Sequence, residues 1–336
     1  MTRQPEQGGA RTGLDLVPFG HGVEVTRLIF GCAPIGGLFA EVSEEMAART
    51  LEETWAQGAR TFDTAPLYGL GLAEERLGAF LAGRPREEFV VCTKVGRLLV
   101  DDDGRARDSE MFFGTPPRAR IHDYSRDGTR RSIEESCERM GLDHVDIALV
   151  HDPSDHMDVA IDQSYADLAQ MRSEGTVKSI GVGSADLAAI ERFCLETDID
   201  CALVPNRYTL LDTSAAERVF PLCLERGIKV MAAGVYNSGV LADPHPGAWY
   251  DYVPVPGPVL ERVLRIQEVC ERHGVPIAHA AAQYPLCHPA VTAVIIGARS
   301  PEEARANSHY VATAVPSALF DELAGAGMIG RGDRTS

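Results

Sequence analysis

The feature that most constrains the fold is a series of short apolar segments that alternate with segments of helical periodicity. The apolar segments cover residues 28–31, 59–65, 89–96, 145–151, 177–183, 201–205, 228–234 and 292–298. Runs that are apolar on both faces are typical of parallel strands covered by helices on each side. These strand–helix units in a chain of 336 residues predict an α/β protein with a closed (β/α)8 barrel, and an open doubly wound sheet is the alternative.

Helical periodicity separates these strands. Helices are predicted over residues 43–58, 72–83, 127–141, 161–174, 187–195, 214–226, 258–273 and 277–286, and a further pair follows the last strand. Ser43 is the expected N-cap of the first helix, because its hydroxyl can accept a hydrogen bond from an unpaired N–H of the first turn. A hairpin around residues 20–22 precedes the first strand. We therefore expect one barrel domain over residues 14–330, with the hairpin as an N-terminal cap and extra helices at the C-terminus.

Two segments do not fit the alternation. Residues 1–13 are polar and are predicted to form a disordered tail. Residues 97–125 are predicted to be a long irregular loop after a strand, which places them over the C-terminal end of the barrel. Such loops usually bind ligands or cover a site.

Composition excludes several classes of partner. The 32 Lys and Arg against 49 Asp and Glu give a net charge of −17, which disfavours nucleic acid and anionic membranes. None of the eight cysteines forms a CxxC pair, and most lie in apolar runs, so we expect reduced thiols in a cytoplasmic protein. The N-terminus lacks an apolar leader, and no apolar run approaches the about 18 residues of a membrane span. A small-molecule substrate is the expected partner, and the oligomeric state stays open.

Ionisable side chains mark the ends of three consecutive predicted strands. They are Asp63, with Tyr68 in the loop that follows, Lys94 and His151. In a barrel the carboxyl ends of the strands share one face, where active sites form. Lys94 would favour the phenolate of Tyr68, whose pKa is ordinarily about 10, and Asp63 would hold Lys94. We predict an acid/base relay around one carbon–oxygen bond, in which Tyr68 moves the proton and His151 hydrogen-bonds the oxygen.

Two other interpretations of these residues are open. Asp63 and Lys94 could be a structural ion pair, with Tyr68 and His151 as packed side chains. A metal-dependent hydrolase could instead use the cluster His151, Asp152, Asp155 and His156. However, no second strand end offers a His or carboxylate cluster, and Pro153 breaks the helical spacing. No metal is therefore expected.

The motifs "FDTAPLYG", "EERLG", "TKVG", "VDIALVH", "GTVKSIGVGS" and "VIIGARSPEEARAN" resemble those of the aldo-keto reductases. The resemblance runs from about residue 23 to the last helices. It implies a TIM barrel with an N-terminal hairpin and a catalytic tetrad that matches Asp63, Tyr68, Lys94 and His151. It also implies hydride transfer with a nicotinamide cofactor held without a Rossmann fold, which fits the absence of a complete GxGxxG motif.

A narrower resemblance links the segment 122–156 and the motif "NRYTLLD" to the branch with bacterial L-fucose and D-threo-aldose dehydrogenases and pyridoxal 4-dehydrogenase. It implies oxidation of an aldose at C1 to the lactone by hydride transfer to NAD. The alternatives are a pyridoxal 4-dehydrogenase-like enzyme, a general aldehyde or ketone reductase, and a non-catalytic nicotinamide-binding subunit.

The resemblance also assigns cofactor contacts. Residues expected around the adenosine phosphate are Gly297, Ala298, Arg299, Glu303 and Asn307, and residues expected near the nicotinamide and its neighbouring groups are Ser184, Tyr236, Asn237, Ser238 and Gly239. NADP-preferring relatives carry basic residues at the positions of Gly297 and Glu303. Because Glu303 would repel a 2′-phosphate, NAD is expected as the preferred cofactor over NADP. The usual tyrosine that stacks on the nicotinamide ring corresponds to Ala233, so either Tyr236 stacks on the ring instead or the stacking platform is formed differently.

Four further residues are expected to line the substrate site. They are Leu67, His122, Tyr124 and Tyr208, and their polar and aromatic character suits a sugar or a pyridine ring.

Overall fold

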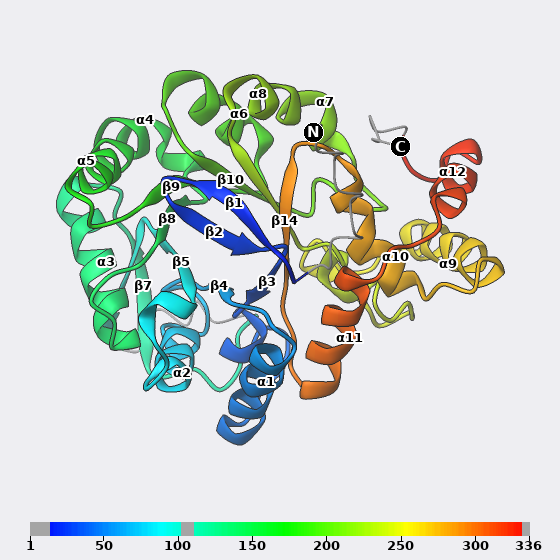
Figure 1. Cartoon of the computed structure of the whole chain (residues 1–336), viewed down its shortest axis with the longest axis horizontal. Helices are drawn as coiled ribbons and strands as arrows, with labels where there is room; N and C mark the ends of the chain where they lie inside the picture. Colours follow the sequence, from blue (N-terminus) through cyan, green and yellow to red (C-terminus); the bar gives the residue numbers. More distant parts are fainter. Residues whose placement is uncertain (1–13, 102–110, 331–336) are drawn as a thin grey trace, which may run out of the picture.

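Parallel strands close into a barrel in the computed structural model of the chain, which describes residues 14–101 and 111–330 (Figure 1). The strands follow one another around the ring in chain order, and the last closes against the first. They are β3 (Leu28–Gly31), β4 (Thr61–Asp63), β5 (Val90–Val95), β8 (Ile147–His151), β9 (Ser179–Gly183), β10 (Cys201–Pro205), β11 (Lys229–Ala233) and β14 (Val291–Ile296). The predicted (β/α)8 barrel is confirmed, and the doubly wound sheet is excluded. The expected tail over residues 1–13 lies outside the described residues.

The helices surround the barrel (Figure 1). They are α1 (Glu44–Ala56), α2 (Leu72–Leu81), α3 (Arg126–Met140), α4 (Met157–Val159), α5 (Ala166–Glu174), α6 (Leu187–Glu196), α7 (Ser214–Arg218), α8 (Phe220–Arg226), α9 (Gly257–Arg272), α10 (Ile277–Gln283), α11 (Pro301–Ala312) and α12 (Ser317–Gly325). Short 3₁₀ turns cover Pro34–Gly36, Arg86–Glu88, Ser154–His156, Asn237–Gly239 and Tyr284–Cys287. The predicted cap of the first helix is confirmed, since the Ser43 side chain accepts from the Met46 amide.

Two predicted helices are less regular than their periodicity suggested. The helix expected over 161–174 begins earlier, at α4, and passes through a π-helical segment, Ala160–Tyr165. The helix expected over 214–226 is divided at Val219 into α7 and α8. Pro221 explains the break, because proline lacks an amide N–H and its ring crowds the preceding turn.

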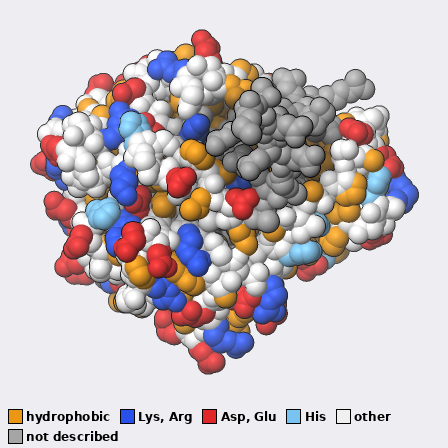
Figure 2. All heavy atoms as spheres, viewed as in Figure 1, with side chains coloured by type: hydrophobic (Ala, Val, Ile, Leu, Met, Phe, Trp, Pro, Cys, Tyr) orange, Lys and Arg blue, Asp and Glu red, His pale blue; other side chains and the backbone are white. Residues whose placement is uncertain are grey.

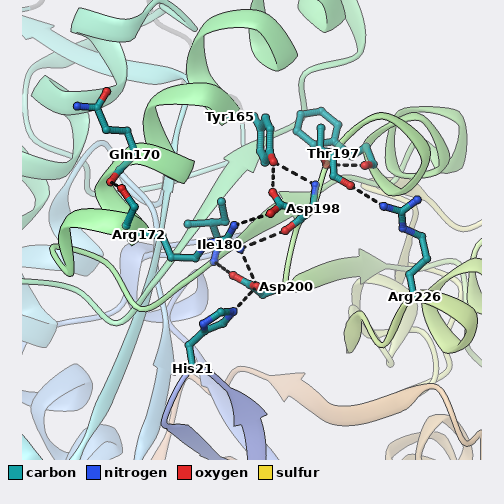
Figure 3. Close-up of polar contacts among 11 residues, drawn as sticks. His21, Tyr165, Gln170, Arg172, Ile180, Thr197, Asp198, Asp200 and Arg226 are labelled. Carbon is teal, nitrogen blue, oxygen red and sulfur yellow. Dashed lines mark hydrogen bonds and ion pairs between the residues drawn. The ribbon is translucent and has the colours of Figure 1, made fainter.

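A hairpin closes the N-terminal end of the barrel. Strand β1 (Leu16–Gly20) pairs with β2 (Val23–Thr26), and its apolar side chains join the barrel interior, where Phe19 and Val25 belong to the same buried cluster as Ile147. His21 at the hairpin tip lies 2.8 Å from a carboxylate oxygen of Asp200, which also binds Arg172 (Figure 3). The hairpin is thus tied to the barrel by packing and by a polar contact.

The predicted irregular loop over 97–125 contains a hairpin in its described part, so the prediction of a loop without secondary structure is wrong for that part. Strand β6 (Arg97–Asp101) pairs antiparallel with β7 (Arg118–His122). The hairpin was missed because β7 alternates charged and apolar residues, and the apolar run of β6, Leu98 to Val100, has only three residues. Residues 102–110 lie outside the described range. A second, shorter hairpin, β12 (Trp249–Tyr250) with β13 (Val253–Pro254), follows β11.

The surface and the cysteines agree with the composition. On the described part of the face that carries the β1–β2 hairpin, acidic and basic side chains are intermixed (Figure 2). All eight cysteines are free, and six of them are buried. Within residues 14–101 and 111–330, no helix is long and apolar enough to cross a membrane.

Candidate active site

The four predicted catalytic side chains meet at the C-terminal end of the barrel. Asp63 is the last residue of β4, Lys94 lies in β5 and His151 is the last residue of β8. Because β4 pairs with β5 and β5 with β8, the three side chains come from adjacent strands. Tyr68 lies in the turn between β4 and α2.

The turn that carries Tyr68 depends on a close approach of two glycines. Gly69 has a φ of +64°, and a Cβ there would lie 2.3 Å from the carbonyl oxygen of Gly36. Only glycine can occupy this position without displacing the neighbouring backbone. The turn after β3 therefore packs directly against the backbone of Tyr68 and fixes its place at the barrel mouth.

A buried ion pair lies beneath Tyr68. The Lys94 ammonium donates to both carboxylate oxygens of Asp63 at 2.8 and 2.9 Å and to the Thr64 carbonyl at 2.9 Å. Both side chains are at most 3% exposed. Burial alone would lower the pKa of Lys94, but the charge of Asp63 and the neighbouring Tyr68 raise it above its usual value. Lys94 is therefore a permanent cation at this point of the barrel.

Tyr68 lies between this cation and His151. The Lys94 ammonium is 4.5 Å from the centroid of the Tyr68 ring, and the His151 ring is perpendicular to it with centroids 6.1 Å apart. Burial raises the pKa of Tyr68 above its ordinary value and outweighs the lowering by Lys94. Lys94 acts in the predicted direction, but the net shift of the pKa of Tyr68 is upward, the opposite of the one expected.

His151 is neutral. Burial, followed by the charges of Arg97 and Lys94, holds the pKa of His151 well below its ordinary value. The Arg97 guanidinium lies 3.5 Å from Nδ1 of His151 and binds the Asp152 carboxylate at 2.9 Å. The Tyr124 hydroxyl donates to the carbonyl oxygen of His151 at 2.6 Å. The strand end is thus fixed through both its backbone and its side chain.

A cleft of about 380 Å³ opens beside these residues. Its lining includes Arg97, Arg120, His122, Asp152, His156 and Ser184. The groups that contact His151 therefore also line the cleft. Its walls carry both cationic hydrogen-bond donors and anionic acceptors.

The alternative metal site lacks the geometry that it needs. Among the described residues, no three His, Cys, Asp or Glu side chains are grouped so that they could hold a metal ion. Asp152 binds Arg97, and His156 packs against the rings of His122 and Tyr124. These contacts assign the side chains to the wall of the cleft.

A comparison with protein families decides the relationship of the chain. The family model described as the aldo/keto reductase family matches residues 27–326. The chain belongs to the aldo/keto reductase family. As an aldo-keto reductase, it is an oxidoreductase that uses a nicotinamide cofactor on small carbonyl or alcohol substrates.

Individual relatives of this aldo-keto reductase cover nearly the whole chain. A D-threo-aldose 1-dehydrogenase from a Pseudomonas species is 42% identical over 92% of this chain and 96% of that protein. A pyridoxal 4-dehydrogenase from Microbacterium luteolum is 36% identical over the same shares. Among solved structures, an aldo-keto reductase from Bacillus halodurans in its holo form has a TM-score of 0.74 at 25% identity and covers 91% of this chain and 93% of that one.

Several predicted cofactor residues of the aldo-keto reductase lie together after β11 and β14. The Tyr236 hydroxyl donates to Asn307 at 2.7 Å, and the Asn307 amide donates to the Gly297 carbonyl at 3.2 Å. Glu303 accepts from the backbone amide of Arg299 at 2.8 Å. Ala298 is buried between Gly297 and Arg299. The loops after β11 and β14 thus form one wall. The Tyr236 side chain, however, is hydrogen-bonded to Asn307 of α11.

The remaining predicted contacts surround the mouth of the barrel. Asn237, Ser238 and Gly239 have φ values of +46°, +61° and +112°, so their backbone turns sharply after β11. Ser184 is buried at the end of β9 and accepts from the Asp186 amide at 3.1 Å.

Two buried amides fit a nicotinamide group. The side chains of Asn206 and Asn237 are 1% exposed, and within the described residues the Asn237 amide has no partner at hydrogen-bond distance. Buried amides normally find partners, and a carboxamide would offer both a donor and an acceptor. Asn206, Asn237 and Ser184 would hold this part of the cofactor, with Gly297 to Asn307 at its phosphate end.

The predicted substrate residues are placed less uniformly. Leu67 is half-buried next to Tyr68, and His122 is exposed on the wall of the cleft. Tyr124 is 3% exposed, and its hydroxyl serves the backbone of His151 and Asp152. Tyr208 is 1% exposed and stacks on Tyr284 at 5.3 Å within the core. The chain turns back at Asn206, where φ is +62°, and this turn carries Tyr208 away from the cleft, contrary to expectation.

Two residues of the site escaped the sequence reasoning. Arg97 contacts His151, and Asn206 presents its amide at the barrel mouth. Both are polar residues just beyond a barrel strand, β5 and β10 respectively. That position is the signal that identified the other four, and it would have identified these two.

Proposed function

We propose that this aldo-keto reductase is an NAD-dependent dehydrogenase that oxidises an aldose at C1 to the lactone. The observation that carries the proposal is the contact of Tyr68 with the buried Lys94–Asp63 pair, beside a neutral His151. The relative at 42% identity, named as a D-threo-aldose 1-dehydrogenase, supports the sugar as the substrate.

The side chains act on one oxygen of the substrate. Tyr68 accepts the proton of the C1 hydroxyl, and the Lys94 ammonium stabilises the phenolate that takes it. His151 donates a hydrogen bond to the same oxygen and orients it. Asp63 holds Lys94 in place. A nicotinamide cofactor held by Ser184, Asn206 and Asn237 would supply the hydride acceptor for C1.

The polarity of the cleft supports a substrate with many hydroxyl groups. Arg97, Arg120 and Ser184 offer donors, and Asp152 offers a carboxylate that is 42% exposed. Neighbouring hydroxyls of a sugar need both kinds of partner. The aromatic cluster of His122, Tyr124 and His156, with ring centroids 5.2 to 6.3 Å apart, favours a second candidate, the pyridine ring of pyridoxal.

The environment of Glu303 supports NAD over NADP. Its carboxylate is fixed at the start of α11 by the Arg299 amide, where it would repel a 2′-phosphate. Arg305, the second arginine of this segment after Arg299, binds Glu53 of α1 at 2.9 and 3.0 Å. The eight free cysteines suit a reducing compartment such as the cytoplasm.

The test is the formation of reduced nicotinamide from NAD with a panel of L-fucose, D-threo-aldoses, pyridoxal and simple alcohols. The proposal predicts the highest kcat/KM for an aldose, with a lactone as the product. A higher kcat/KM for pyridoxal would replace the sugar by the second candidate. No turnover of any member in either direction would contradict the proposed activity.

A further inference from the structure

The ring of His151 lies between two groups of opposite hydrogen-bonding character. A guanidinium nitrogen of Arg97 is 3.5 Å from Nδ1. A carboxylate oxygen of Asp152 is 3.5 Å from Nε2. The two groups are joined to each other by the 2.9 Å Arg97–Asp152 ion pair, so that they form one clamp across the ring.

This arrangement selects one tautomer of the imidazole. A guanidinium has only donors, and Nδ1 beside it can take part only as an acceptor. A carboxylate has only acceptors. At 3.5 Å from Nε2 the Asp152 oxygen is too distant for a full hydrogen bond, so it favours a proton on Nε2 electrostatically and leaves that N–H free to donate to a substrate. The partner of one ring nitrogen determines the protonation of the other. Both sides of the clamp therefore favour neutral imidazole with its proton on Nε2.

We propose that Arg97 is a positioning residue of the active site, which together with Asp152 holds His151 as the Nε2–H donor. The use of that donor on the substrate oxygen rests on the proposed dehydrogenase function, whereas the tautomer itself does not. Arg97 is the first residue of β6, and its side chain is 9% exposed. The hairpin over the barrel thus supplies a residue that tunes the barrel's own histidine.

Most other groups that face His151 act in the same sense or are neutral, whereas the Asp152 carboxylate favours a second proton on the ring. The groups are Lys94 of β5, Tyr68 of the turn after β4, Arg120 and His122 of β7, Tyr124, and Asp152. Burial and the positive charges oppose a second proton on the ring and depress the pKa of His151. Among the positive charges around His151, that of Arg97 lowers its pKa most, and Arg97 is the cation in contact with Nδ1.

A direct test is the ¹⁵N spectrum of the histidine side chains in the full chain without cofactor. The His151→Asn variant identifies the His151 signals. The wild type should show a protonated Nε2 and an unprotonated Nδ1 at neutral pH. Arg97→Met, which keeps an apolar stem but has no donor, should show loss of this pattern through the Nδ1–H tautomer or a doubly protonated ring. A protonated Nδ1 in the wild type, or an unchanged pattern in Arg97→Met, would overturn the proposal.

Two further variants test whether the change in the spectrum comes from the specific Arg97–His151 contact or from a general effect of a substitution in the hairpin. Arg97→Lys keeps a cation that can only donate, and it should retain the Nε2–H pattern at least in part. Arg118→Met removes the same charge from the same hairpin, but Arg118 binds Glu75 of α2 at 2.7 Å, so its His151 spectrum should match the wild type. If Arg118→Met changed the His151 spectrum as strongly as Arg97→Met, a specific contact would be refuted.

Kinetics give a second readout that a merely structural role would not move. In Arg97→Met the acid limb of kcat/KM should shift upward by about one to three pH units, because one adjacent charge moves a buried group by that much. The KM for NAD should stay near its wild-type value. If the spectra are as expected but no substrate is turned over, the assignment of the Nε2–H tautomer stands and only the proposed function is contradicted. If an active Arg97→Met enzyme shows no shift of the acid limb, the positioning role of Arg97 is contradicted.

Discussion

The Lys94 ammonium lies 2.8 Å from one carboxylate oxygen of Asp63 and 2.9 Å from the other, in a part of the barrel that solvent scarcely reaches. The pair joins two adjacent strands, β4 and β5. A buried ion pair of this kind is costly to break, because the partner that remains is an uncompensated charge. Stability and catalysis therefore depend on the same contact.

Replacing either partner alone should destabilise the protein. Asp63→Asn and Lys94→Met should each lower the free energy of unfolding by about 3–5 kcal/mol, measured by urea denaturation. The double variant Asp63→Leu/Lys94→Met leaves no unpaired charge and should lose less stability than the sum of the two. Recovery of stability without recovery of activity is expected in the double variant. Turnover at the wild-type rate in Lys94→Met would show that the cation has no part in catalysis.

The pKa of Tyr68 predicts the direction of the pH dependence. Oxidation needs the phenolate, and burial raises the pKa of Tyr68 above its ordinary value, so the reactive fraction grows as the pH rises. In initial-rate measurements, kcat/KM for oxidation should increase toward alkaline pH, and kcat/KM for carbonyl reduction, which needs the protonated phenol, should decrease. An oxidation rate that fell from neutral to alkaline pH in the stable range of the protein would be incompatible with Tyr68 as the base.

Neutralising Glu303 should relax the preference for NAD. In Glu303→Gln the side-chain oxygen can still accept from the Arg299 amide, but the charge that repels a 2′-phosphate is gone. The ratio of kcat/KM for NADP to that for NAD should rise by about tenfold, equivalent to about 1.4 kcal/mol. Glu302→Gln, at the neighbouring exposed position of α11, is the matched control and should change the ratio much less. Equal effects of the two variants would leave Glu303 without a specific role.

Helices α2 and α3 meet at a glycine. A Cβ on Gly78 would lie 2.5 Å from the Cα of Met140, although alanine is otherwise preferred to glycine within a helix. Gly78→Ala should therefore lower the free energy of unfolding, by about 1–3 kcal/mol as in other overpacked interiors. Gly325→Ala is the control, because nothing lies within 4 Å of a Cβ at that position of α12. Its thermal midpoint should stay the same or rise; a stable Gly78→Ala variant would contradict the close packing.

The sequence could predict the barrel because its strands are marked by apolar runs, and it could predict the meeting of Asp63, Lys94 and His151 because strand ends share one face. It could not predict the β6–β7 hairpin, whose short strands of mixed charged and apolar residues are held by cross-strand hydrogen bonds. The prediction that Tyr208 lines the substrate site failed for a related reason. The direction of Tyr208 depends on the left-handed turn at Asn206, and nothing in the pattern of apolar residues reports that turn.

The direction of the overall pKa shift of Tyr68 also could not be predicted from the sequence. The residues around it could be named, and the effect of Lys94 has the expected sign. The size of the burial effect, however, depends on how completely Phe112 and the barrel enclose the phenol. That is a property of the packed structure.

The central claim is that Tyr68 moves the proton in a reaction for which a bound nicotinamide would supply the hydride acceptor. The most direct measurement compares wild type and Tyr68→Phe for reduced nicotinamide formed from NAD with the best aldose, alongside calorimetric titration with NAD. The account predicts a fall in kcat of about 10²–10⁴-fold with little change in the Kd for NAD. Wild-type turnover in Tyr68→Phe would contradict it.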